Sequence, residues 1–251
     1  MEYIKVNLND IEFCEMLIDH INNKKPFSMS RFGDGEILLL KRKLYPRLKD
    51  KFCERWGINK NDYTKAENLT INIINESLKN SDVLRFMDPN NNICKSIDCN
   101  PKKWSLPIQK LEKINRVKEN LICDHQVSRG KELGTIEGLK KILRGNDLHI
   151  ISSRTEILKK KNIDSLLGCS VYYTHIPFNS TWKQREMMKE KINDIKENIV
   201  IESLGVFYKD IPSLLSAKGK ICLDFGATID AWCNIDSRQW FNSTQKYLKI
   251  R

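Results

Sequence analysis

Long hydrophobic runs are missing from this sequence. The longest, such as residues 37–40, are far shorter than the roughly 20 residues that a helix needs to cross a bilayer. The N-terminal residues Met-Glu-Tyr-Ile-Lys-Val-Asn contain no basic region followed by an apolar core, so we expect no signal peptide. These absences predict a cytoplasmic protein.

Clustered cysteine and histidine ligands are missing as well. The eight cysteines are scattered without a Cys-x-x-Cys pair, and the four histidines are equally dispersed. Because a zinc site needs clustered ligands, this distribution argues against one. We expect the cysteines to be reduced and to behave as small, buried hydrophobic residues.

The glycine motifs of common nucleotide-binding folds are also absent. The chain contains neither Gly-x-Gly-x-x-Gly nor a Walker-type Gly-Lys-Ser/Thr, which disfavours a dinucleotide-dependent enzyme and a P-loop kinase. It has no linker rich in proline, glycine or serine, no internal repeat and no low-complexity tract. For a chain of 251 residues we therefore predict a single domain over residues 1–251.

Acidic residues are outnumbered by basic ones, and the formal net charge is +11. Such a balance suits nucleic acid, an anionic membrane surface or phosphorylated substrates. The lysines are spread along the whole chain, so no nucleic-acid stripe stands out and we expect no nucleic-acid partner. The densest basic stretch, residues 41–51, is either a solvated helix face or loop, or a patch that contacts a membrane or lipid phosphate. The second interpretation places the protein at the inner face of the membrane.

Helix-like and strand-like patterns alternate along the chain. We expect helices over residues 8–23, 64–79, 105–117, 131–143, 181–196 and 207–217, and strands over 26–32, 81–87, 120–124, 148–152, 170–176, 198–203 and 221–224. Strands that alternate with helices of this length pair in parallel through right-handed crossovers. The predicted fold is α/β, a doubly wound, mostly parallel, Rossmann-like sheet flanked by helices, with a helical elaboration in residues 40–130. Within that elaboration, the polar segment 90–100 is interpreted as a surface loop or a lid.

The turn after the first expected strand carries Arg31, Asp34 and Glu36, with Gly33 and Gly35 between them. With the next helix expected to start near Glu36, Asp34 and Glu36 lie two apart in an extended or tightly turned backbone and converge on one point. Two carboxylates suffice for Mg²⁺ or Mn²⁺ that is shared with a diphosphate, and arginine is a bidentate phosphate partner. The same residue types also occur in ordinary surface turns before a helix.

Further polar residues follow the other expected strands, where an open α/β sheet binds its ligands. Small hydroxyls, an arginine and a glycine before a helix make a phosphate-compatible environment. The residues that follow these strands are His125 and Arg129, Ser152, Ser153 and Arg154, Asn179 and Ser180, Ser203 and Gly205, and Asp224, Gly226 and Asp230.

The string Ser30-Arg-Phe-Gly-Asp-Gly-Glu-Ile37 resembles the signature of the bacterial glycosyltransferases of the GT-D fold. In that family the Asp-x-Glu element is needed for metal-dependent use of a nucleotide-sugar. The resemblance extends to residues 150–154, to Ser203-Leu-Gly205 and to the last strand with its following turn, residues 223–232. It covers residues 26–40 and 146–233. Some relatives have Gly-His-x-Asp after that strand, where this chain has Gly226-Ala-Thr-Ile-Asp230, so no role is carried over for that histidine.

The resemblance implies a metal-dependent glycosyltransferase that moves a hexose, with glucose expected, from a UDP-sugar to a glycan, glycoprotein or lipid-linked acceptor. Asp34 and Glu36 are then the expected ligands of Mn²⁺ or Mg²⁺. Asp224 or Asp230 is expected to position or deprotonate the acceptor hydroxyl, although Asp224 equally suits a cap for the next helix. The expected donor-binding residues are Arg31, Gly33, Gly35, Ser152, Ser153, Arg154, Asn179, Ser180, Gly205 and Gly226.

Two alternatives stay open. A basic nucleic-acid-binding α/β module would bind DNA or RNA with salt-sensitive affinity and would not need Asp34 or Glu36. Another metal-dependent phosphate-transfer enzyme or hydrolase would use the same carboxylates but release phosphate instead of a nucleoside diphosphate.

Overall fold

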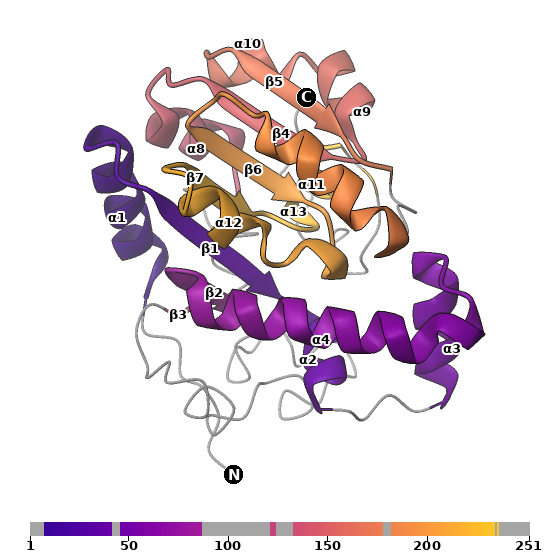
Figure 1. Ribbon diagram of the computed structural model, residues 1–251. Coiled ribbons are helices and arrows are strands. Elements are labelled where there is room, and N and C mark those ends of the chain that lie inside the picture. Colours follow the sequence, from indigo (N-terminus) through magenta and orange to yellow (C-terminus); the bar gives the residue numbers. More distant parts are fainter. Residues whose placement is uncertain are drawn as a thin grey trace, which may run out of the picture.

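A computed structural model describes residues 8–41, 46–86, 121–123, 133–177, 182–233 and 235. In this part the chain forms one sheet of seven strands, all paired in parallel, in the order β3-β2-β1-β7-β6-β4-β5 (Figure 1). The strands are β1 (Phe27–Phe32), β2 (Val83–Phe86), β3 (Leu121–Cys123), β4 (Leu148–Ser152), β5 (Val171–His175), β6 (Ile199–Ser203) and β7 (Ile221–Asp224). The chain adds strands on both sides of β1, so the predicted doubly wound α/β fold is confirmed.

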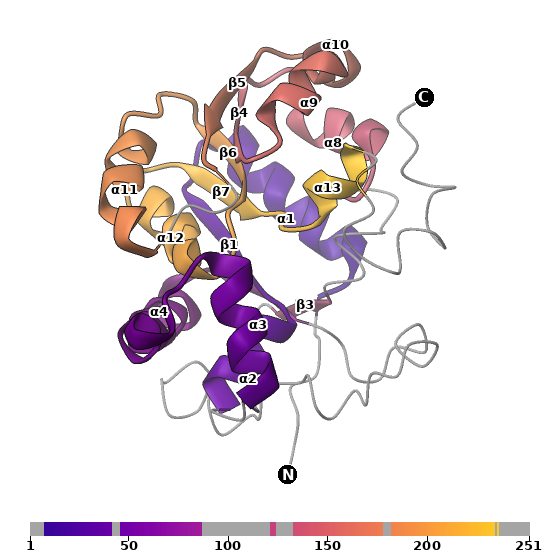
Figure 2. The ribbon, with the colours of Figure 1, turned by 90° about the vertical axis from the view of Figure 1, so that its right-hand side faces the viewer.

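Helices cover both faces of this sheet (Figures 1 and 2). The α-helices are α1 (Asp10–Asn22), α2 (Asp34–Lys41), α3 (Pro46–Trp56), α4 (Tyr63–Asn80), α8 (Ile136–Leu143), α9 (Thr155–Lys160), α10 (Ile163–Leu167), α11 (Arg185–Asn193), α12 (Ile211–Ser216) and α13 (Thr228–Trp232). Short 3-10 helices are η1 (Lys60–Asp62), η3 (Trp182–Gln184) and η4 (Val206–Tyr208). Helices α3, α4, α11 and α12 pack on one face, and α1, α8, α9, α10 and α13 pack on the other.

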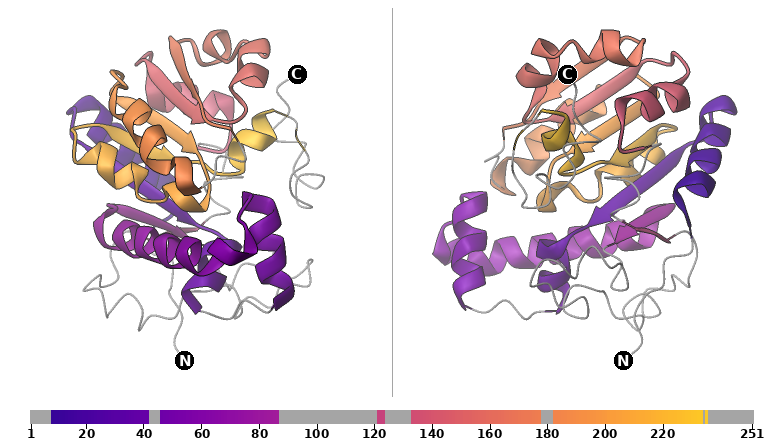
Figure 3. Two further views of the ribbon diagram at one scale, coloured as in Figure 1. Left: turned by 45° about the vertical axis from the view of Figure 1, so that its right-hand side comes forward. Right: turned by 180° about the vertical axis from the view of Figure 1, so that it is seen from behind.

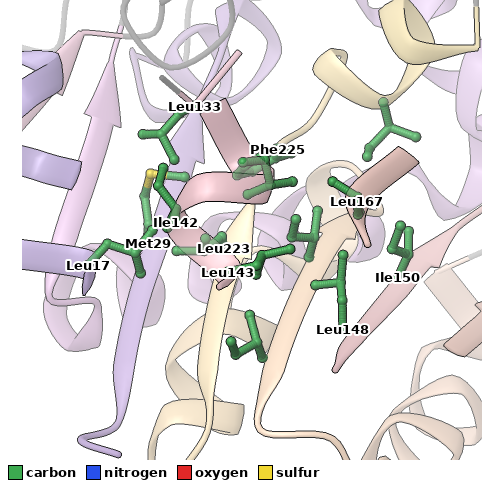
Figure 4. Close-up of a cluster of buried hydrophobic side chains, with 14 of the residues drawn as sticks. Leu17, Met29, Leu133, Ile142, Leu143, Leu148, Ile150, Leu167, Leu223 and Phe225 are labelled. Carbon is green, nitrogen blue, oxygen red and sulfur yellow. The ribbon is translucent and has the colours of Figure 1, made fainter. Parts of the chain in front are cut away.

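Two hydrophobic clusters form because successive strand residues point to opposite faces of the sheet. Ile151 of β4 belongs to the cluster under α4 and α12, whereas its neighbour Ile150 belongs to the cluster under α1 and α8. Figure 4 shows the second cluster, where Leu17 of α1, Met29 of β1 and Leu143 of α8 gather over the strands. Strands that are buried on both faces read as nearly continuous apolar runs, which is the pattern that made them recognisable in the sequence.

Local signals place several helix boundaries. Helix α1 begins with a capping box, in which the Asn9 side chain accepts the Glu12 N–H at 2.9 Å and the Glu12 side chain accepts the Asn9 N–H at 2.9 Å. The helix expected over 131–143 begins at Ile136, after an N-cap at Thr135. The helix expected over 207–217 is divided into η4 and α12, since Pro212 lacks the N–H that would bond a carbonyl one turn earlier.

Other expectations meet the structure only in part. The helix expected over 181–196 is shorter and consists of η3 and α11. Helices α3 and α4 belong to the expected elaboration, while the segment 90–100, the helix at 105–117 and the residues His125 and Arg129 lie outside the described residues. The prediction of buried cysteines is confirmed for Cys14, Cys53, Cys222 and Cys233, whereas Cys169 is only half-buried, and the reduced state of the cysteines stays a prediction.

The basic stretch of residues 41–51 leads into a helix whose aromatic residues face the core. Phe52 and Trp56 of α3 are buried and pack edge-on against Phe207. Lys51 is exposed on the same helix. These aromatic rings are therefore engaged within the fold, and contact of the lysines with a membrane stays a prediction. Among the described helices, none combines the length and the apolar character needed to span a bilayer.

Candidate active site

The carboxyl ends of the parallel strands meet along one edge of the sheet. This edge comes forward in the left-hand view of Figure 3. At this edge β1 and β7 are neighbours, in a register that pairs Met29 with Leu223. The turn that follows β1 and the turn that follows β7 therefore lie together. This arrangement brings five of the predicted residues to one place, namely Arg31, Gly33, Glu36, Asp224 and Gly226.

Arg31 is half-buried between two of the predicted glycines. A Cβ atom added to Gly33 would come within 3.0 Å of Arg31 Nη1, and one added to Gly226 within 2.9 Å of Arg31 Cδ. Gly226 also has a φ of +48°, in the left-handed region that glycine adopts readily. Glycine at both positions thus leaves room for a guanidinium, whose forked N–H donors match a phosphate.

Helix α2 begins at Asp34, two residues earlier than expected. The backbone between Asp34 and Glu36 is therefore helical, where we had expected an extended or tightly turned one. Glu36 is only 5 % exposed. Its Oε2 atom accepts the Gly33 N–H at 3.1 Å, and its Oε1 atom lies 3.4 Å from the Lys209 ammonium. Glu36 therefore fixes the turn that precedes its own helix.

Lys209 is a buried cation at this edge that the sequence did not reveal. Its Nζ atom donates to Asp224 Oδ2 at 2.6 Å, and the same oxygen accepts the Arg31 backbone N–H at 3.2 Å. Burial alone would lower the pKa of Lys209, but the charges of Asp224 and Glu36 outweigh burial and raise it. In a chain with 43 lysines and arginines, no sequence pattern singles out this one. Asp224 is fully buried, and this environment does not suit the general base that we considered for it.

Glu202 of β6 adds a third carboxyl beside Asp224, its register partner on β7. Its Oε2 atom accepts the Leu204 N–H at 2.8 Å. Burial, and then the charge of Asp224, raise the pKa of Glu202 well above its ordinary value. Burial thus disfavours the charged form of Glu202, which shares this cluster with Lys209, Glu36 and Asp224.

Glu202→Gln is expected to stabilise the protein increasingly as the pH rises. A group whose pKa is raised by folding contributes stability below its unfolded pKa of 4.5, and this contribution is lost as the pH rises toward the folded value. A glutamine keeps the size of the side chain but cannot ionise, which removes that loss. We expect melting temperatures equal to wild type at pH 4 and higher by about 2–4 °C or more at pH 8, since about 1 kcal/mol gives that shift in a chain of this size.

The matched control for this measurement is Glu186→Gln, which neutralises a side chain that is 79 % exposed on α11. It should leave the difference from wild type independent of pH over the same range. A Glu202→Gln variant that is less stable than wild type by the same amount at every pH would contradict a raised pKa of Glu202.

A second polar cluster lies at the ends of β4 and β5. Arg154 Nε donates to Asp230 Oδ1 of α13 at 2.8 Å, and both side chains are partly exposed. His175 Nδ1 lies 3.1 Å from the Thr155 hydroxyl, at the end of β5. We did not select His175 from the sequence, although its place at a strand end is the signal that selected the others. Arg154 and Asp230 are thus brought together as partners of each other.

Two of the residues that we expected to bind the donor, Ser152 and Gly205, have roles within the fold. Ser152 is buried, and its hydroxyl accepts the Arg154 N–H at 3.1 Å. Gly205 has a φ of +82°, and a Cβ atom there would lie 2.2 Å from the Trp56 ring, so its glycine serves the packing of α3. Ser203 donates to the Gly226 carbonyl at 2.8 Å and thereby joins the ends of β6 and β7.

For four further predicted residues, the part of the chain that the structure describes shows no contact that indicates a role. Gly35 lies in the first turn of α2, with nothing closer than 4.0 Å to an added Cβ atom, and Ser153 is half-buried at the end of β4. Asn179 and Ser180 lie outside the described residues. Binding roles for all four stay predictions.

Comparison with known proteins gives the same fold. Residues 8–232 match the family model of the GT-D fold-like domain. No curated protein matches the chain. A selenomethionine-substituted protein of the domain of unknown function 1792 resembles it with a TM-score of 0.60 and 19 % identity, over 96 % of this chain and 82 % of that one.

Two more solved structures are similar over 96 % of this chain. One, of domain 1792 and described as a distinct glycosyltransferase fold, has a TM-score of 0.58 and 20 % identity, with 82 % of its own chain covered. The other, a glycosyltransferase of domain 1792 from Streptococcus sanguinis, has a TM-score of 0.57 and 18 % identity, with 85 % covered. The chain therefore belongs to the GT-D-like family of glycosyltransferase-fold enzymes, as the resemblance in its sequence predicted.

Proposed function

We propose that this enzyme transfers a hexose, with glucose expected, from a UDP-sugar to a glycan, glycoprotein or lipid-linked acceptor. The observation that carries the proposal is the guanidinium of Arg31, held between Gly33 and Gly226 beside the first turn of α2. Arginine supplies paired N–H donors, and a helix N-terminus supplies free backbone N–H groups at its positive end. Both suit a diphosphate, which gains negative charge as the sugar leaves.

A divalent cation, Mn²⁺ or Mg²⁺, fits this turn as a site with few protein ligands. Within the described ranges, no group of three or more histidine, cysteine, aspartate or glutamate side chains is arranged so that it could hold a metal ion. A cation shared with a diphosphate needs only one or two carboxylates, and Asp34 is the candidate ligand at the start of α2. The carboxylate oxygens of Glu36 contact Gly33 and Lys209. We therefore propose that Glu36 holds in place the turn that binds the metal ion. When bound, the cation neutralises charge on the departing UDP.

The acceptor side is proposed at α13. Asp224 is fully buried and paired with Lys209, so an acceptor hydroxyl does not reach it. The Asp230 side chain is 16 % exposed, and it remains the candidate for the carboxylate that positions the acceptor hydroxyl. Arg154, which donates to Asp230, and its chain neighbour Ser153 are the candidates for contacts with the ribose or a phosphate of the donor.

Calorimetric titration of UDP, with and without Mn²⁺, tests the donor site. Wild type should bind UDP more tightly with the metal, and Asp34→Ala should lose this metal dependence. The expected loss is about 10-fold or more, in the range found when metal-site residues are replaced. Glu190→Ala, on the exposed surface of α11, is the control for loss of one carboxylate.

The outcomes separate the candidate functions. If UDP and the other common nucleoside diphosphates bind neither wild type nor variant, the donor proposal fails. If nucleic acid then binds with salt-sensitive affinity that does not depend on Asp34, the basic-module alternative is favoured. If a nucleotide-sugar is consumed with release of inorganic phosphate instead of UDP, the protein is a hydrolase or phosphate-transfer enzyme.

A further inference from the structure

Lys209 follows η4 and lies beneath the turn between β1 and α2. Its side chain is 2 % exposed, so it has no access to a substrate in solution. Its backbone is held in place as well, because the Lys209 carbonyl accepts the Ser30 hydroxyl of β1 at 3.2 Å. A lysine so deeply buried is retained in folds only with charged partners.

The two carboxylates that contact Lys209 both hold backbone N–H groups at the end of β1. Asp224 Oδ2, at 2.6 Å from the ammonium, accepts the Arg31 N–H at 3.2 Å. Glu36 Oε1 lies 3.4 Å from the ammonium, and Glu36 Oε2 accepts the Gly33 N–H at 3.1 Å. The Lys209 ammonium thus contacts both carboxylates that accept the backbone N–H groups of the residues flanking Phe32. One of these carboxylates, Asp224, comes from β7, and the other, Glu36, comes from α2.

Removing this cation would take from the two buried carboxylates the ammonium group that contacts both of them. Like charges at such a site repel, and a buried carboxylate without a partner is strongly unfavourable. Asp224 lies on a central strand and cannot move out of the core. Glu36 lies on the first turn of α2, and its movement toward solvent would take the acceptor away from Gly33.

We propose that Lys209 is a positioning residue, which acts through Glu36 and Asp224 to hold the β1–α2 turn in the form that presents Arg31 and the N-terminus of α2 to the donor. Lys209 itself does not touch the donor. The link to donor binding rests on the function proposed above, whereas the link to the turn is independent of it.

Hydrogen exchange and calorimetry on Lys209→Met test both links. Backbone amides of residues 27–41 should exchange faster than in wild type, while those of α4 (63–80) keep their rates. At a temperature where the variant is fully folded, its affinity for UDP should fall by about 10-fold, as when a residue behind a binding group is replaced.

The matched control is Arg185→Met. Arg185 is also a buried cation, and it pairs with Asp210, the residue next to Lys209, but it contacts neither Glu36 nor Asp224. Its loss should lower the melting temperature while leaving exchange in residues 27–41 and UDP affinity as in wild type. This control separates positioning of the turn from a general loss of stability.

A second variant covers the case in which Lys209→Met does not fold. Lys209→Met/Asp224→Asn removes the charge on both partners, and the asparagine oxygen still accepts the Arg31 N–H. Faster exchange at Gly33 and the first turn of α2 is expected there too. Unchanged exchange in residues 27–41 in the variant that folds overturns the proposal. Faster exchange with unchanged UDP affinity overturns the role in donor binding. If wild type binds no nucleotide but exchange is accelerated, the proposed function fails and the hold of Lys209 on the turn stands.

Discussion

Gly205→Ala is expected to destabilise the protein by about 2–4 kcal/mol, because it combines a strained backbone with overpacking. The φ of +82° disfavours any residue with a Cβ atom, and the added atom would lie 2.2 Å from the Trp56 ring. Trp56 is buried and packs edge-on against Phe207, so movement of its ring would disturb this packing. The melting temperature should fall by about 2–4 °C for each kcal/mol.

Gly219→Ala is the control that isolates the clash. Gly219 has a similar φ of +85°, and nothing lies within 4 Å of its added Cβ atom. Its substitution should therefore show the backbone cost alone, about 1 kcal/mol. Equal losses at the two positions would show that Trp56 moves aside freely. A Gly205→Ala protein with normal stability but lost UDP binding would instead restore the phosphate role first expected of this glycine.

Arg31→Met is expected to weaken UDP binding by about 10–100-fold, which corresponds to the 1.5–3 kcal/mol that hydrogen bonds to charged groups contribute. Methionine keeps an apolar side chain between Gly33 and Gly226 but removes every N–H donor. The Arg31 backbone N–H continues to bind Asp224, so the strand end should stay in place. Calorimetry with UDP and Mn²⁺ measures the loss.

Two further variants sharpen this prediction. Lys25→Met removes an exposed positive charge from the other end of β1 and should leave UDP affinity unchanged. Arg31→Lys keeps the charge without the forked geometry and should give an intermediate loss. If Lys25→Met weakens binding as much as Arg31→Met does, general attraction by the net charge of +11 explains the affinity, and the arginine has no specific role.

The fold was predictable because its signals are local. A strand buried on both faces leaves an apolar run such as Ile199-Val-Ile in β6, and a capping box marks the start of α1. The predicted helix boundaries were wrong where a single residue or the tertiary context determines them. Pro212 divides one expected helix, and α2 extends two residues further toward β1 than its sequence indicated.

The site was predictable only as far as strand ends reveal it. Arg31, Gly33 and Gly226 were found because parallel strands present their carboxyl ends along one edge. Lys209 contacts Glu36 from a part of the chain far away in sequence, and no spacing rule links them. The inward turn of Glu36 was missed for a related reason, because spacing by two was read as extended backbone where the chain is helical.

Because β1 pairs with β7, the centre of the sheet can form only after β7 has been synthesised. Arg31 and the Asp224 carboxylate that accepts its N–H are separated by 193 positions, and β7 is the last strand that the structure describes. As the chain leaves the ribosome, β1 and β2 emerge early, but one edge of β1 stays without its partner until residues 221–224 appear. An open strand edge is prone to pair with other chains. A nascent chain of this enzyme therefore carries an open edge of β1 until β7 has been made, and the proposed donor site is incomplete until then.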